Sequence, residues 1–293
     1  MNPLQTDPVQ ALISDELRQW VQGQHQSGHD AAQLLRAMQD SGWSATQARQ
    51  VLQHLLPQAG DLPAALAPAA TQATAQRGPD IRPAHGQPWV DGGDRRVPVL
   101  CQWNTPRIVV LGQVLDAQEC DELIAQARSR LRRSQTVQAS DGEAQVHDAR
   151  TSDGMFFQRG ETDLCERIEA RLARLMDWPV ENGEGLQVLR YGVGAEYRPH
   201  FDYFDTRQPG APAVLRRGGQ RLATVVIYLN SPPAGGSTVF PDAGVEVMPL
   251  QGHAVFFSYP QATPASLSLH AGTPVLAGEK WVATKWVRER RFD

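Results

Sequence analysis

The spacing of hydrophobic residues divides the chain into a helical part, a part without periodicity and a strand-rich part. Within residues 1–57, apolar residues recur at helical spacing in three short segments. Each segment follows a capping signature, so we expect helices to begin after Asp7, Asp30 and Ser44. Three amphipathic helices predict a small bundle. Residues 58–96 are rich in Pro, Ala, Gln and Gly, and we interpret them as a linker.

Residues 97–293 show a different pattern, with helices first and strands afterwards. Arg107–Leu111 is a β-branched run that predicts a strand. Asp116 and Thr162 each begin an amphipathic helical pattern with a capping residue. After Pro179, short runs bounded by turn residues predict strands at Gly185–Arg190, Arg221–Leu229, His253–Phe257 and Trp281–Val287. This order predicts an α+β domain, a β-sandwich or jelly roll backed by helices.

Composition excludes several classes of protein. The chain is 41% hydrophobic and 20% charged with a net charge of -4, which indicates neither a nucleic-acid partner nor a membrane partner. The start MNPLQTDPVQ lacks the pattern of a signal peptide, and no apolar run approaches the roughly 20 residues of a membrane span. Three cysteines without CxxC spacing predict neither a disulfide framework nor a zinc site. We therefore expect a cytoplasmic protein.

A candidate metal motif lies in the segment LRYGVGAEYRPHFDYF. On a strand, His200 and Asp202 point to the same face, about 6–7 Å apart. Two histidines and one carboxylate on one side of a metal leave positions open, the arrangement of non-haem iron(II) oxygenases. The third ligand would come from a distant strand, and spacing alone leaves His253 and His270 as candidates.

Five segments carry a resemblance to a known family: ARTSDGMF, YGVGAEYRPHFDYF, GGQRLATVVIYLN, GGSTVFPDAG and SLHAGTPVLAGEKWVATKWVRER. In order and separation they resemble the catalytic domain of prolyl 4-hydroxylases, from about Val109 to Arg290. The resemblance implies a double-stranded β-helix fold. It also implies that His200, Asp202 and His270 are the catalytic iron(II) ligands.

The same resemblance implies a site for the cosubstrate 2-oxoglutarate. It assigns Lys280 as the cation that pairs with the distal carboxylate, with Tyr191 and Thr238 beside it. The alternation of KWVATKWV places Lys280 and Trp286 on one face and Lys285 on the other. We therefore expect Lys285 to be a structural residue rather than a ligand of the cosubstrate.

The substrate groove is also implied by the resemblance. Tyr197, Arg221 and Trp286 match positions that line a peptide groove, and Arg150 begins a segment similar to a mobile substrate loop. An aromatic floor suits a proline ring, and a guanidinium can donate to a peptide carbonyl. We further predict that the Pro/Gly/Arg-rich loop between Phe204 and Val225 shapes substrate choice.

The expected activity is hydroxylation of a prolyl residue, at its 4-position, in a peptide or protein. It would consume 2-oxoglutarate and O₂, release succinate and CO₂, and use ascorbate as a reductant. Asp202 fills the third protein position, which favours hydroxylation over halogenation. One alternative is oxidation of a free amino acid or another small molecule. The other is a binding protein that has the fold but no turnover.

The helical part allows two interpretations. Its segment LLRAMQDSGWSATQARQVL resembles, over about 45 residues, a ubiquitin-associated bundle with Trp43 in a loop. We interpret residues 1–57 as a docking or stabilising appendage, with binding of a protein partner as the alternative.

Overall fold

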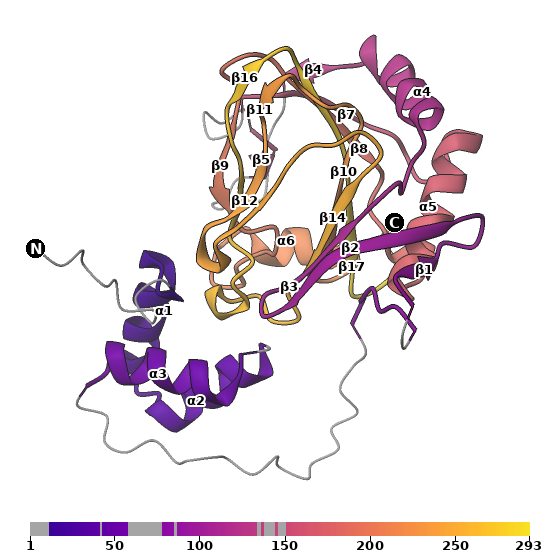
Figure 1. Cartoon of the computed structure of the whole chain (residues 1–293). Helices are drawn as coiled ribbons and strands as arrows, with labels where there is room; N and C mark the ends of the chain where they lie inside the picture. Colours follow the sequence, from indigo (N-terminus) through magenta and orange to yellow (C-terminus); the bar gives the residue numbers. More distant parts are fainter. Residues whose placement is uncertain are drawn as a thin grey trace, which may run out of the picture.

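Two antiparallel sheets form the centre of the larger part of the chain (Figure 1). The computed structural model describes residues 12–41, 43–57, 78–84, 87–133, 136–137, 144–145 and 151–293. The nine-stranded sheet runs in the order β1 (Trp89–Asp91), β2 (Arg96–Asn104), β3 (Arg107–Leu111), β14 (Ala254–Ser258), β10 (Arg221–Tyr228), β17 (Lys280–Arg288), β8 (Gln187–Tyr191), β7 (Asp153–Phe156), β4 (Arg132–Arg133).

A four-stranded sheet faces it, in the order β13 (Val245–Val247), β12 (Thr238–Phe240), β15 (His270–Gly272), β9 (Tyr197–His200). The described residues also form two separate strand pairs: β11 (Ala234–Gly235) with β16 (Val275–Ala277), and β5 (Thr136–Val137) with β6 (Ala144–Gln145). This arrangement confirms the predicted double-stranded β-helix, an α+β jelly roll.

Side chains alternate across the large sheet because successive strand residues point to opposite faces. On β10, Val225 and Ile227 join a buried cluster with Ile168 of the helix α5 (Asp163–Met176). Tyr228, one residue further, packs with Phe240 between the two sheets instead. The large sheet therefore has one face toward helices and one toward the interior of the jelly roll.

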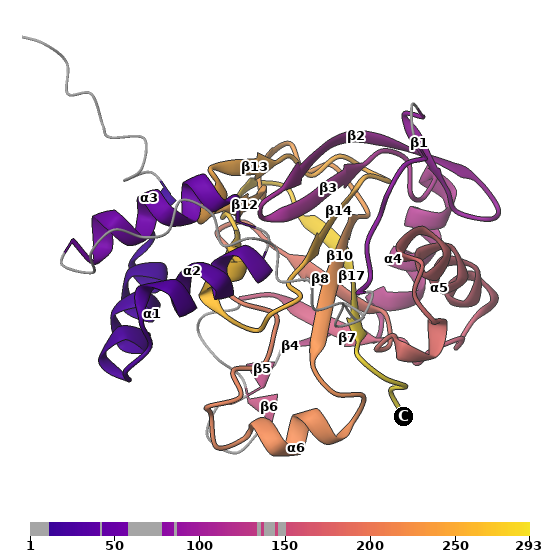
Figure 2. The same cartoon turned by 90° about the horizontal axis from the view of Figure 1, so that it is seen from below.

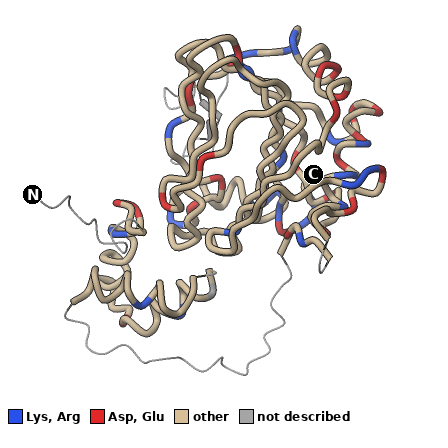
Figure 3. Tube along the Cα trace, in the orientation of Figure 1, with Lys and Arg blue, Asp and Glu red and all other residues tan. Residues whose placement is uncertain are grey.

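The helices of this part begin where the capping signatures predict. In α4 (Ala117–Arg128), Asp116 accepts from the Glu119 amide at 2.9 Å, and Glu119 accepts from the Asp116 amide at 3.1 Å. In α5, Thr162 accepts from the Cys165 amide at 3.2 Å. Each cap satisfies amides that have no partner inside the helix. Charged residues of both signs lie along both helices (Figure 3).

Within the first 57 residues, the described part (12–41 and 43–57) contains three helices: α1 (Asp15–Gln26), α2 (Ala31–Asp40) and α3 (Ala45–Leu55). The predicted caps Asp30 and Ser44 are present, each accepting from the amide three residues later. The predicted cap Asp7 lies outside the described residues, and the helix that contains Leu17 and Trp20 begins at Asp15, with Ser14 as its cap. Figure 2 places this helical unit beside β12 and β13.

Two other boundaries differ from the sequence-based expectation. β1 and the start of β2 lie inside the predicted linker and pair antiparallel, with Val90 opposite Val97. Both valines are buried. β1 was not predicted because three residues flanked by Pro and Gly are too few to show the alternation of a strand. A short helix, α6 (Ala211–Arg216), lies in the segment that we read as a loop, with Pro212 in its first turn. Among the described residues, no helix has the length and apolar character of a membrane span.

Candidate metal centre and cosubstrate pocket

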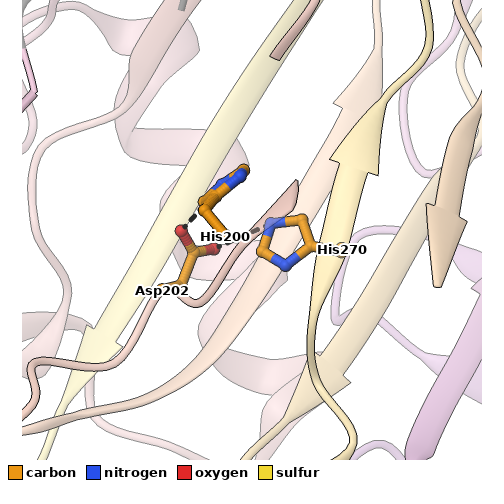
Figure 4. Close-up of side chains that lie close together, drawn as sticks. All are labelled: His200, Asp202 and His270. Carbon is orange, nitrogen blue, oxygen red and sulfur yellow. Dashed lines mark ion pairs between the residues drawn. The ribbon is translucent and has the colours of Figure 1, made fainter. Parts of the chain in front are cut away.

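Strand pairing places two histidines that are distant in the sequence directly opposite each other. β9 ends at His200 and β15 begins at His270, and these two residues are directly opposed in the antiparallel register. Their ring centroids lie 4.2 Å apart. Asp202, just beyond β9, lies beside both rings: its carboxylate oxygens are 3.6 Å from His200 Nε2 and 3.5 Å from His270 Nε2 (Figure 4).

Backbone carbonyls orient both imidazoles. His200 Nδ1 lies 2.8 Å from the Arg198 carbonyl, and His270 Nδ1 lies 3.0 Å from the Ser268 carbonyl. A carbonyl can only accept, so in each ring Nδ1 donates the proton and Nε2 keeps a free lone pair. Such backbone bonds commonly fix the tautomer of metal-binding histidines. The two free Nε2 atoms and the carboxylate therefore form a donor set that fits Fe(II).

The electrostatics favour the same protonation states. Burial, together with the neighbouring His200, lowers the pKa of His270 to about 4, so this imidazole is neutral at pH 7. Burial alone would raise the pKa of Asp202, but the adjacent histidines lower it well below its usual range. A neutral imidazole beside an ionised carboxylate is the state that a divalent metal requires.

Asp202 is held by a hydrogen-bond chain that the sequence did not reveal. Thr224 Oγ1 donates to Asp202 Oδ2 at 2.8 Å and also lies 2.8 Å from the hydroxyl of Tyr259. Thr224 and Tyr259 are both 0% exposed. In the sequence, Thr224 stands out only as a polar residue within the alternating run of β10. This pattern does not identify Asp202 as its partner.

The structure separates the two candidates for the third position. His253 lies just before β14, where its Nδ1 contacts the Gln251 carbonyl at 3.1 Å. Among the described residues, His200, Asp202 and His270 are the one group of three that could hold a metal, with ligand atoms within 4.8 Å of one another.

Lys280 lies in the same pocket as these residues. Its side chain is 5% exposed, and its Nζ lies 5.6 Å from the Tyr191 ring centre and 5.7 Å from that of Tyr228. Burial lowers the pKa of Lys280 to about 8. Thr238, also in the pocket, accepts from the Tyr228 hydroxyl at 2.8 Å.

The backbone beside Lys280 approaches it closely. Gly236 has a φ of +73°, and a Cβ built there would lie 3.0 Å from Lys280 Cδ. Glycine is favoured at this position by conformation and by space. Among the described residues, no carboxylate pairs with Lys280. A buried ammonium without a charge partner suits a site that binds an anion.

The predicted substrate residues divide into two groups. Tyr197 stacks on the His200 ring with centroids 3.5 Å apart, and Trp286 lines the same pocket. Arg221 packs 4.0 Å over the Trp286 ring, but its guanidinium is already ion-paired with Glu184 at 2.6 Å. Sequence reasoning missed Glu184, because nothing in its local pattern marks a buried carboxylate. Arg150 lies outside the described residues.

Lys285 faces away from the pocket, as the alternation predicts. Its Nζ contacts Glu169 of α5 at 2.5 Å and also donates to the Glu184 carbonyl. The side chain lies on the helix-covered face of the sheet with Trp281 and Val287. Lys285 is therefore a buried structural cation.

Comparison with known proteins identifies the family. The model of the 2OG-Fe(II) oxygenase superfamily matches residues 186–288. Prolyl 4-hydroxylase 2 of Arabidopsis thaliana is 42% identical over 211 residues, which cover 64% of this chain and 69% of that protein. Prolyl 4-hydroxylase 1 of the same plant is 41% identical over 213 residues, covering 66% and 72%. The chain belongs to the prolyl 4-hydroxylase family.

A similar solved structure is that of a viral collagen prolyl hydroxylase from Paramecium Bursaria Chlorella virus-1 in complex with 2OG. It is 29% identical, covers 62% of this chain and 95% of that chain, and gives a TM-score of 0.48. As a member of the prolyl 4-hydroxylase family, the chain is a 2-oxoglutarate-dependent dioxygenase that uses Fe(II), 2-oxoglutarate and O₂. The predicted enzyme class and the predicted use of Fe(II), 2-oxoglutarate and O₂ are thereby confirmed.

Proposed function

We propose that this enzyme hydroxylates a prolyl residue of a peptide or protein, with iron held by His200, Asp202 and His270. The observation that carries the proposal is the convergence of these three donors on one point beside the buried Lys280. Two of the similar plant proteins are named prolyl 4-hydroxylases, which supports a prolyl substrate.

The residues around the metal position have distinct tasks. Lys280 binds the distal carboxylate of 2-oxoglutarate, with Tyr191 and Thr238 lining the same end of the pocket. Bound Fe(II) supplies the oxidising chemistry, in which O₂ and 2-oxoglutarate yield a hydroxylated substrate, succinate and CO₂. The hydrogen bonds from Thr224 to Asp202 and from His270 to the Ser268 carbonyl keep the donors oriented.

Two aromatic side chains define the substrate side. The Tyr197 ring lies flat against His200, so it limits the approach to the metal from that side. Trp286 is 6% exposed, and the Arg221 guanidinium packs over its ring. The indole therefore forms a fixed apolar surface beside the pocket. A pyrrolidine ring packs well on such a surface, because it presents only C–H groups to the indole.

The decisive experiment measures succinate release from 2-oxoglutarate. The enzyme is loaded anaerobically with Fe(II) and exposed to air, with and without proline-containing peptides, and His270→Ala is assayed beside it. Peptide-stimulated succinate, a peptide mass gain of one oxygen, and loss of both in the variant are the expected results. Turnover without stimulation by peptide indicates a small-molecule substrate, and bound iron without turnover indicates a binding protein.

Further expectations belong to this proposal. We propose a cytoplasmic enzyme with ascorbate as its reductant, and the three free cysteines support a reducing compartment. We also propose that α6 and its flanking segment influence the choice of peptide, because they follow the metal motif directly. Exchange of Ala211–Arg216 for a short glycine-serine linker would then change the ranking of a peptide panel.

A further inference from the structure

The core of the helical unit is completed by two residues of the catalytic domain. Ala265 and Leu267, which are 0% and 2% exposed, belong to the same buried cluster as Leu17, Leu35 and Trp43. They lie in and directly after the 3-10 turn η4 (Pro264–Ser266), which follows β14. The apolar interior of the bundle is therefore shared with a segment that leads toward the metal site.

Hydrogen bonds fix the same contact. Trp43 Nε1 donates to the Ala265 carbonyl at 2.5 Å, and Ser41 Oγ donates to Gln261 Oε1 at 3.0 Å. Trp43 is 4% exposed. Trp43, the loop residue of the segment that resembles a ubiquitin-associated bundle, is thus in contact with the chain's own catalytic domain.

Leu267 has a backbone conformation that leucine rarely adopts. Its φ is +54°, in the left-handed region, where the Cβ atom crowds the following carbonyl. Such a residue persists only where its surroundings enforce it. Two contacts hold Leu267 in this conformation. Its amide donates to the Pro264 carbonyl at 3.0 Å, and its side chain is buried in the helical unit.

The segment after Leu267 orients His270. Ser268 follows directly, and its carbonyl accepts the His270 Nδ1 proton at 3.0 Å. Its hydroxyl lies 2.8 Å from that of Ser266, and both serines are buried. The direction in which the chain leaves Leu267 therefore determines where the Ser268 carbonyl lies, and with it the direction of His270 Nε2.

We infer that the helical unit, residues 12–57, is a positioning element for the third metal ligand. By docking Trp43 on Ala265 and burying Leu267, it holds the segment that orients His270. The inference rests on the proposed role of His270 as an iron ligand. It assigns residues 12–57 a task inside the enzyme rather than the capture of a separate protein.

The test is anaerobic titration of the full chain with Co(II), followed by visible absorption, for the wild type, Trp43→Ala, Leu267→Ala and Arg36→Ala. Arg36 is an exposed residue of α2 and serves as the matched control. We expect Trp43→Ala and Leu267→Ala to bind Co(II) about 10-fold more weakly, the scale of an altered contact behind a metal ligand, and Arg36→Ala to bind as the wild type does. Saturating Fe(II) should restore the turnover of Trp43→Ala, because only ligand placement has changed.

A conservative variant and a double variant extend the test. Trp43→Phe keeps a ring but removes the donor to Ala265, so we expect a smaller loss of Co(II) affinity than with Trp43→Ala. Alanine keeps the Cβ atom, and with it the strain of the left-handed conformation, but removes the side chain that is buried in the helical unit. Because Trp43→Ala already weakens this docking, adding Leu267→Ala should cost less affinity in the Trp43→Ala background than in the wild type, a non-additivity typical of coupled residues. If Trp43→Ala does not fold, Trp43→Phe and Leu267→Ala provide the test.

His270→Ala separates this inference from the proposed function. If His270→Ala binds Co(II) as tightly as the wild type, the assignment of the metal ligand is wrong. If His270→Ala loses Co(II) but Trp43→Phe and Leu267→Ala retain wild-type affinity, the metal assignment stands and the positioning role is refuted.

Discussion

Lys280→Met removes one positive charge from the cosubstrate pocket with little change in side-chain length. The chain contains two lysines, and both lie on β17, on opposite faces. Lys285→Met is therefore a matched control: the same substitution on the same strand, but outside the pocket. The comparison separates loss of an anion-binding charge from general disturbance of the sheet.

The size of the effect follows from burial. Lys280 is 5% exposed, so water screens its charge weakly and the distal carboxylate of 2-oxoglutarate would be its ion-pair partner. Removing one partner of a buried charged pair costs about 2–5 kcal/mol. At about 1.4 kcal/mol per factor of ten, the KM for 2-oxoglutarate should rise about 30-fold to several thousand-fold.

The same residue predicts a pH dependence. Burial lowers the pKa of Lys280 to about 8, and a lysine is charged below its pKa. The affinity for 2-oxoglutarate should therefore be greatest below pH 8. Above it, the KM of the wild type should rise about 10-fold for each pH unit, because each unit removes a factor of ten from the charged fraction. Lys280→Met should lack this slope.

Succinate release over a range of 2-oxoglutarate concentrations and pH values measures both effects. Lys285→Met should instead lower the free energy of unfolding by about 3–5 kcal/mol, because it leaves Glu169 buried without its partner. Its KM for 2-oxoglutarate should stay at the wild-type value. An unchanged KM in Lys280→Met, or equal increases in both variants, would refute the assignment of the pocket.

Three further substitutions test other parts of the structure. Thr224→Val removes the hydrogen bond to Asp202 and should weaken Co(II) binding about 10-fold, whereas unchanged binding would show that this bond has no role in the metal site. Glu184→Ala removes the ion-pair partner of Arg221, so urea unfolding should show that the free energy of unfolding falls by about 3 kcal/mol. The KM for peptide should also rise, and wild-type values for both quantities would contradict this role. Burial raises the pKa of Asp242 to about 6, so the contribution of Asp242 to the unfolding free energy should fall by on the order of 3 kcal/mol as the pH rises from about 4 to about 6. Asp242→Asn should lack this contribution, and parallel urea-unfolding profiles of the two proteins would contradict it.

The sequence alone determined those features that depend on near neighbours along the chain. Capping by Asp116 and Thr162 involves residues three positions apart, and the structure has both caps. The common face of Lys280 and Trp286 follows from strand alternation, as does the opposite orientation of Lys285. His200 and Asp202 are also near neighbours, two residues apart. The motif therefore indicated two metal donors on the same face of a strand.

Only the tertiary structure decided features that join distant parts of the chain. Spacing could not choose between His253 and His270; the pairing of β15 with β9 places His270 opposite His200. The contact of Trp43 with Ala265 joins residues 222 positions apart, and no local pattern records it. Strand register and domain docking depend on which surfaces meet after folding. A sequence shows which side chains share a face, and the fold determines what that face contacts.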